Sequence, residues 1–155
     1  MEAKFRDANG RAVEDFKKEI LDFVKKDHTY QLFIGSDSQL HRGEDCVVYA
    51  TVVVIYKQSK GGRFFVRKKK GAILKSLRER LARETWESVE LAIQMKEFLP
   101  GNVDLQVHVD SNSSKRYKSG NYTEELVGMI TSQGFKCRIK PDAWAAQTIA
   151  NRFTK

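Results

Sequence analysis

The chain has 155 residues, which is most simply one domain with room for a sizeable hydrophobic core. Its share of 41% hydrophobic and 31% charged residues is ordinary for a soluble globular protein, and no run approaches the ~18 apolar residues of a membrane span. The net charge of +8 favours a polyanionic partner, although it does not identify one.

The cysteines and the N-terminus both indicate the cytoplasm. Cys46 and Cys137 are isolated, without a Cys-x-x-Cys pair or a nearby histidine at ligand spacing, so reduced thiols are expected and a zinc site is not. The first residues are charged throughout and lack an apolar signal segment. We therefore expect a cytoplasmic protein without a membrane segment, and its oligomeric state is not indicated by the sequence.

Apolar patterning predicts a leading helix, three strands, and then helices alternating with strands. The leading helix has an apolar stripe from Val13 to Val24 and is expected to cover a sheet. The expected strands are 30–34, 46–56, 63–70, 103–110 and 135–139, and the later helices are 73–99, 123–133 and 142–153.

The lengths of the connections predict how these strands pair. Short turns join the first three strands, which favours an antiparallel meander. Strands separated by a long helix are usually parallel, with a right-handed crossover, so 103–110 should lie beside 30–34. We expect one α/β domain over 1–155, with a helical extension at 1–29 and a core at 30–155.

Two aspartates follow these neighbouring strands. Asp37 comes after an apolar strand that looks buried on both faces, and burying an unpaired charge costs several kcal/mol. Asp110 ends the later strand, so both carboxylates should meet at one edge of the sheet, where ligands bind in such folds. A pair of this kind repels without a cation between its members. The alternative for each aspartate alone is a turn-former after a strand, and it is harder to maintain for the two together.

The long helix offers several glutamates, and its periodicity separates them. One row at alternating spacings of four and three is expected to be buried, and it contains Leu77, Leu81, Glu84, Ser88, Leu91, Met95 and Phe98. Glu84 is in the middle of that row, so it either pairs with Arg80 or points at the sheet near Asp37. Glu87 is expected on the solvated arc, as a surface residue paired with Arg83 at i,i+4.

Asp142 follows Pro141 and opens the last expected helix. An aspartate there is a good N-cap, worth ~1 kcal/mol. The same carboxylate can also face the strand ends, so capping and metal binding both stay open.

With these positions assigned, the sequence resembles the ribonuclease H-like superfamily of nucleases and integrases over about residues 30–153. The acidic positions of that superfamily match Asp37, Glu84, Asp110 and Asp142. The segments 35–39 and 140–146, with Asn151-Arg152, look more narrowly like a small bacterial family of predicted ribonuclease H-related proteins. The resemblance implies a ribonuclease H-like fold, with a five-stranded mixed sheet of three antiparallel strands and two added in parallel, flanked by helices.

The resemblance also implies an activity, namely phosphodiester hydrolysis by a two-metal nuclease in which the four carboxylates are catalytic and bind metal. Oxygen ligands select Mg²⁺ or Mn²⁺, with two ions ~3.5–4 Å apart. The nucleic acid would be RNA, DNA or a hybrid. Two basic clusters are candidates for contacting it, although such clusters are more often plain solvated surface, and their residues are Lys115, Arg116, Lys118, Arg67 and Lys69.

Two departures from that superfamily leave other functions open. The segment before Asp142 has no room for the histidine-bearing loop of ribonuclease H enzymes, and a basic substrate-gripping helix is absent. The alternative is a nucleic-acid-binding or scaffolding module without efficient catalysis. A third class, an actin-like ATPase half, would need glycine-rich phosphate hairpins, and Arg42-Gly43 and Gly61-Gly62 are too few glycines for that.

Overall fold

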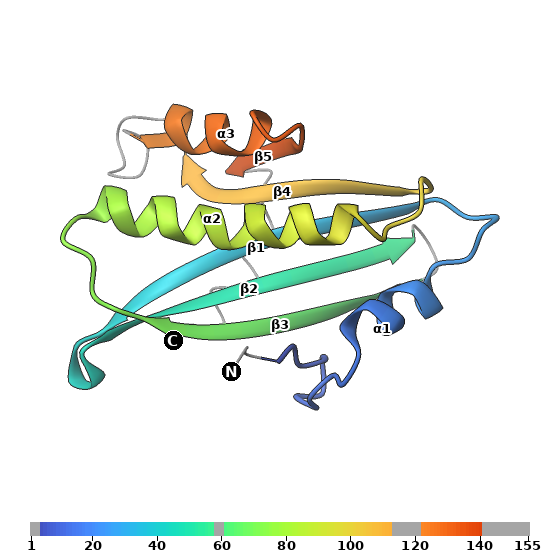
Figure 1. The fold of residues 1–155 in the computed structure, drawn as a ribbon, viewed down its shortest axis with the longest axis horizontal. Helices are drawn as coiled ribbons and strands as arrows, with labels where there is room; N and C mark the ends of the chain where they lie inside the picture. Colours follow the sequence, from blue (N-terminus) through green and yellow to red (C-terminus); the bar gives the residue numbers. More distant parts are fainter. Residues whose placement is uncertain (1–3, 58–60, 113–121, 141–155) are drawn as a thin grey trace.

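The computed structural model describes residues 4–57, 61–112 and 122–140, and at 110–112 and 140 it describes the backbone alone. Five strands form one sheet in the order β3-β2-β1-β4-β5 (Figure 1). The strands are β1 (Tyr30–His41), β2 (Cys46–Lys57), β3 (Gly61–Gly71), β4 (Val103–Asn112) and β5 (Lys136–Lys140). β1, β2 and β3 pair antiparallel, whereas β4 is parallel to β1 and β5 is parallel to β4. The predicted mixed sheet is confirmed.

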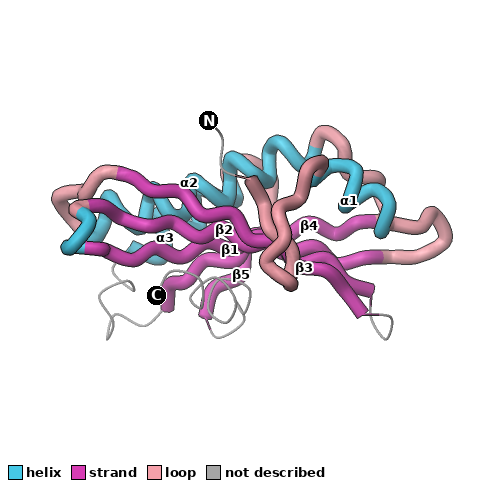
Figure 2. Tube along the Cα trace, turned by 90° about the horizontal axis from the view of Figure 1, so that it is seen from below, coloured by secondary structure: helices cyan, strands magenta, loops and turns pink. Residues whose placement is uncertain are grey.

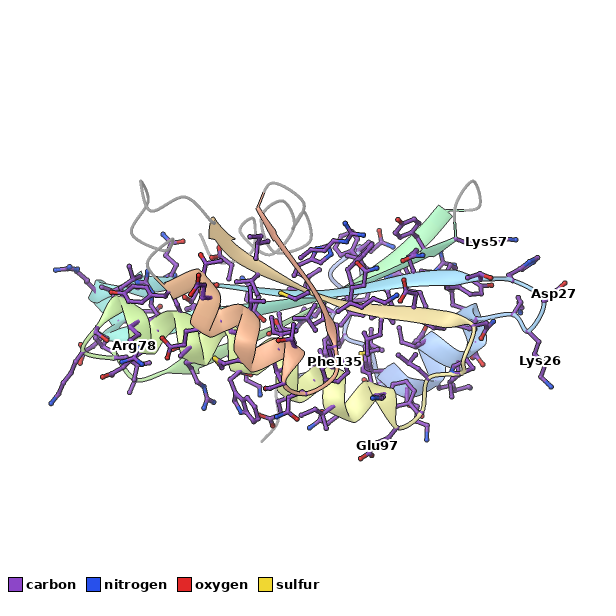
Figure 3. The ribbon with its side chains drawn as sticks, turned by 90° about the horizontal axis from the view of Figure 1, so that it is seen from above. Lys26, Asp27, Lys57, Arg78, Glu97 and Phe135 are labelled. Atoms are coloured by element: carbon purple, nitrogen blue, oxygen red, sulfur yellow. The ribbon has the colours of Figure 1, made fainter. Side chains whose placement is uncertain are left out.

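The described helices are α1 (Phe16–Phe23), α2 (Leu77–Lys96) and α3 (Thr123–Thr131), and Figure 3 shows them on one side of the sheet. α2 packs on β1 and β4, and α3 packs beside α2 on β4 and β5. Ser76 begins α2 by accepting a hydrogen bond from the backbone N–H of Glu79, as an N-cap residue does. The helix expected at 142–153 lies outside the described residues. In the described part of the chain, no helix is long and apolar enough to cross a membrane.

β1 is longer than the sequence predicts. It was expected over 30–34, but its pairing with β2 runs without interruption from Gln31↔Tyr56 to His41↔Cys46. The polar segment 35–39 therefore continues the strand, because β2 supplies backbone partners along its whole length. The connection to β2 is a short 3₁₀ turn, η1 (Arg42–Glu44), which ends at Asp45 with a φ of 54°. In Figure 2 the strands cross one another in projection near the middle of the molecule, as in a strongly twisted sheet.

Side chains of β1 alternate between two cores. Leu32 and Ile34 belong to the main core on the side of the helices. Phe33 faces the other way and belongs to a smaller apolar cluster. That cluster contains Phe33, Val52, Val54 and Val66, with Tyr56 and Phe64 packed against it.

The segment before α1 is attached to the edge of the sheet. Arg6 bridges both to Ala12 and to Val66 of β3, so the segment runs alongside that strand. The ring of Phe5 stacks on Phe16 with centroids 4.1 Å apart, and Phe16 meets Phe65 of β3 edge-on at 5.3 Å. These aromatic contacts join α1 and the N-terminal segment to the main core.

Candidate functional site

The predicted site begins where the parallel pairing of β1 and β4 ends. These strands pair from Tyr30↔Val103 to Gly35↔His108. Asp37 lies two residues beyond Gly35, and Asp110 lies two residues beyond His108. The prediction that these two strands are parallel neighbours is confirmed, and their backbones bring both acidic positions to the same edge of that pairing.

Asp37 is inside a strand and not in a turn after one. It pairs with Ala50 in the antiparallel ladder between β1 and β2, and its residue is 9% exposed. The turn-forming interpretation of Asp37 is therefore wrong, because β2 holds β1 extended past the point where β4 leaves it. A buried carboxylate at this position needs partners that reduce the cost of its burial.

Glu84 is buried in the middle of α2, as predicted, and is 5% exposed. The hydroxyl of Ser38 donates a hydrogen bond to Oε2 of Glu84 at 2.6 Å. Strand alternation places Ser38 on the face of the sheet toward α2 and Asp37 on the opposite face. Glu84 therefore reaches β1 one residue beyond Asp37.

The alternative pairing of Glu84 with Arg80 does not form. Nε of Arg80 is buried without a hydrogen-bond partner among the described residues, and the ion pairs of this part of the chain do not include Arg80. Because Glu84 is instead hydrogen-bonded to Ser38, its carboxylate is directed at the sheet and not along its own helix.

A layer of buried hydroxyls fastens α2 to the sheet beside Glu84. The Ser36 hydroxyl lies 2.6 Å from that of Ser88 and 3.0 Å from that of Thr51. The helical row predicted the burial of Ser88, but Ser36 and Thr51 were not among the predicted site residues. Strand alternation could have identified Ser36, because Ser36 and Ser38 continue the inward-facing positions of Leu32 and Ile34.

The prediction for Glu87 is wrong with respect to exposure. Its side chain is only 2% exposed. Oε1 lies 3.0 Å from Nη2 of Arg83, which confirms the i,i+4 pair. Oε2 lies 3.2 Å from Nζ of Lys69 and 4.0 Å from Nη2 of Arg67. At 100° per residue Glu87 is only about 60° around the helix from Glu84, and α2 meets the cationic end of β3 on that side.

The proposed nucleic-acid contacts divide into two groups. Arg67 and Lys69 are described, and both are in ion-pair contact with Glu87, so they are fixed cations and not freely moving surface side chains. The remaining basic candidates and one acidic candidate lie outside the described residues, namely Lys115, Arg116, Lys118 and Asp142.

His108 is a buried neighbour of the site and was not among the predicted site residues. It pairs with Gly35 across β1 and β4, and its ring centroid lies 4.4 Å from that of Phe33. Burial lowers the pKa of His108 to about 4, and the nearby charge of Arg138 acts in the same direction. His108 is therefore neutral at pH 7.

The donors suit a hard divalent cation, although the described side chains do not form a complete site. No group of three or more His, Cys, Asp or Glu in the described ranges is placed to hold a metal ion. Asp37 and Glu84 supply buried carboxylate oxygens from opposite faces of β1, and such oxygens are the ligand chemistry of Mg²⁺ and Mn²⁺. The other two predicted ligands are the side chain of Asp110 and Asp142, which are not among the described side chains.

A sheet of order β3-β2-β1-β4-β5, with a long helix after the third strand, defines the ribonuclease H-like class of folds. A family model described as "Ribonuclease H-like" matches residues 15–155, and the chain belongs to this family. The chain is similar to the uncharacterized protein YkuK of Bacillus subtilis (strain 168), with 31% identity over 157 residues that cover 92% of this chain and 90% of that protein. The predicted fold class and family are thus confirmed.

Proposed function

We propose that this protein is a divalent-metal-dependent nuclease that hydrolyses phosphodiester bonds of RNA, DNA or a hybrid. The observation that supports this most is the arrangement of three acidic positions around one strand edge. The β1–β4 pairing ends two residues before both Asp37 and Asp110, and Glu84 is buried over β1 at Ser38. The match to the ribonuclease H-like family agrees with this arrangement.

Asp37, Glu84, Asp110 and Asp142 would hold Mg²⁺ or Mn²⁺ through their carboxylate oxygens. When bound, such ions activate a water and stabilise the leaving oxygen of a phosphodiester. The burial of Asp37 and Glu84 favours a cation here, because ionised carboxylates in a poorly hydrated place are stabilised by a nearby positive charge.

The protein's own part is to hold these oxygens in place. The Ser38 hydroxyl donates a hydrogen bond to Oε2 of Glu84, and this bond fixes the orientation of the carboxylate. The hydrogen bonds of Ser36 to Ser88 and Thr51 fix α2 against β1 and β2. Both groups of contacts are buried, so the site is organised before a substrate arrives.

A cleavage screen tests this proposal. Single-stranded, double-stranded and hybrid substrates are incubated with Mg²⁺ or Mn²⁺, and the wild type should cleave at least one of them. Asp37→Asn and Glu84→Gln should lose cleavage while unfolding at a nearly unchanged urea concentration, because each keeps the shape and removes the charge. Glu97→Gln, an exposed change just after α2, should keep full activity. Cleavage that persists in Asp37→Asn would contradict the proposal.

The second candidate is a nucleic-acid-binding or scaffolding module with the same fold. The observation that favours it is the net charge of +8, which supplies affinity for a polyanion without any chemistry. Nucleic-acid binding without cleavage, under every metal tested, would select this function over the nuclease.

A further inference from the structure

A pocket of about 270 Å³ lies where β3 leads into α2. Its lining includes Tyr49, Lys69, Lys70, Gly71, Arg83 and Glu87. In Figure 1 the connection from β3 to α2 is at the left end of the molecule. The pocket is on the same side of the sheet as α2, since both Lys69 and Glu87 line it and contact each other.

The charges around this pocket do not cancel. Two lining cations, Lys69 and Arg83, share the single carboxylate of Glu87, which leaves an excess of one positive charge. Lys70 is balanced separately by Glu44 at 3.0 Å. Because Glu87 is only 2% exposed, the positive side chains and not the carboxylate face the solvent. A partly enclosed wall of one sign of charge concentrates counter-ions.

Lys69 and Arg83 keep unused donors. Their side chains are 34% and 53% exposed, and each is in contact with Glu87 through one nitrogen. A lysine ammonium has three N–H donors and a guanidinium has five. Both cations can therefore bind a second anion while Glu87 holds them in position, and a phosphate group accepts such charge-assisted bonds well.

The pocket is close to Glu84, which lies on the same helix and the same face of the sheet as the pocket. Ser38, which bonds to Glu84, pairs with Tyr49, and Tyr49 pairs with Lys69 in the next strand. Neighbouring strands are about 4.8 Å apart, so Lys69 lies about 10 Å from Ser38 across the sheet. At an axial rise of about 3.4 Å per nucleotide, about three nucleotides of one strand bridge that separation.

We infer that this pocket binds a backbone phosphate of the nucleic acid, through Lys69 and Arg83 held by the buried carboxylate of Glu87. The identity of the polymer rests on the proposed function. The capacity to bind a phosphate group rests only on the pocket and its charges, so the two can be tested apart.

Inorganic phosphate tests the pocket without nucleic acid or divalent metal. Phosphate is titrated against chloride at constant ionic strength, and the melting temperature is followed. A ligand that binds only the native state raises it, so the wild type should show a phosphate-dependent increase. Arg83→Gln should lose most of that increase. Lys26→Gln removes the same charge from an exposed position, shown in Figure 3 at the end of the molecule opposite Arg78, and should keep it.

For each variant, the melting temperature with phosphate is compared with the melting temperature of the same variant without phosphate. A change in basal stability therefore does not affect the result. The inference that the pocket binds phosphate would be overturned if phosphate did not raise the melting temperature of the wild type, or if it raised those of wild type and Arg83→Gln equally. With an oligonucleotide, Arg83→Gln should flatten the dependence of log affinity on log salt by about one unit, and Lys26→Gln should not. An unchanged slope in Arg83→Gln would also overturn the inference. Absence of cleavage together with a phosphate-dependent increase would reject the nuclease and retain the pocket.

Discussion

At the scale of single residues, Glu87 determines how β3 and α2 are held together. Its buried carboxylate contacts three cations from both elements. Removing one partner of a buried ion pair leaves uncompensated charge and typically costs 3–5 kcal/mol. Because Arg83 is half-exposed and can turn to water, we expect Glu87→Gln to lower the free energy of unfolding by about 2–3 kcal/mol.

Urea unfolding at pH 7 measures this loss. Glu97→Gln is the matched control, since Figure 3 shows Glu97 projecting outward at the far end of α2, and it should change stability by no more than about 0.5 kcal/mol. Similar effects of both substitutions would show that the carboxylate of Glu87 has little part in stability.

Glu87 and Asp37 also show what periodicity predicts and what it does not. The row through Glu84 and Ser88 was predicted correctly, because a helical row depends only on local spacing. The burial of Glu87 depends on β3 lying under the adjacent arc, which no spacing within the helix reveals. The strand around Asp37 was predicted too short, because its polar segment is kept extended by β2 and not by its own propensity.

At the scale of elements, the N-terminal segment is attached to the sheet by aromatic rings. Phe5 is buried, stacks on Phe16, and has the guanidinium of Arg67 5.0 Å from its ring centroid. Truncating a buried Phe to Ala typically costs 3–5 kcal/mol. We expect Phe5→Ala to cost about 2–4 kcal/mol, because the segment lies at an edge where the cavity can partly collapse.

Chemical denaturation followed by both circular dichroism and fluorescence checks this. The two probes should give one shared transition if the N-terminal segment unfolds with the sheet. Lys4→Ala is the control, because the Lys4–Glu14 pair is exposed and such pairs contribute little. If Phe5→Ala unfolds at the same denaturant concentration as the wild type, the N-terminal segment does not contribute to the stability of the sheet.

The connection pattern of the elements was the most predictable part of the fold. Short turns and one long crossover were enough to place β4 beside β1. The right-handedness of such crossovers and the lengths of the connections leave few possible strand orders. The hydroxyl contacts of Ser36 were not predictable, since they require knowing which helical residue lies above which strand residue. The acidic edge was thus predicted at the level of the backbone, and its side-chain partners were not.

At the scale of the whole molecule, the proposed site links metal binding to stability. If the four carboxylates converge, their repulsion destabilises the metal-free protein, and a divalent ion relieves it. Millimolar Mn²⁺ should therefore raise the melting temperature of the wild type more than that of Asp37→Asn. Scanning calorimetry with and without chelator measures both increases, and equal increases would count against a metal site at Asp37.

The net charge of the molecule allows a last prediction, which separates binding from catalysis. Each phosphate contact releases counter-ions, so log affinity should fall linearly with log salt, with a slope of about −0.7 to −0.9 per contact. Lys115, Arg116 and Lys118 follow Asp110 in sequence, where their segment leaves the end of β4. Replacing the three together by Gln should flatten the slope by about two to three units.

Asp37→Asn is the matched variant, since it should leave the slope nearly unchanged while removing cleavage. Fluorescence anisotropy of a labelled oligonucleotide, measured over a series of salt concentrations in chelator, gives the slope without interference from cleavage. If the triple variant keeps the wild-type slope, the contacts lie elsewhere, with the fixed cations Arg67, Lys69 and Arg83 as the next set to replace. If the wild type shows no salt-dependent binding to any nucleic acid, both the nuclease and the binding module are excluded, because each requires the phosphate backbone to be held.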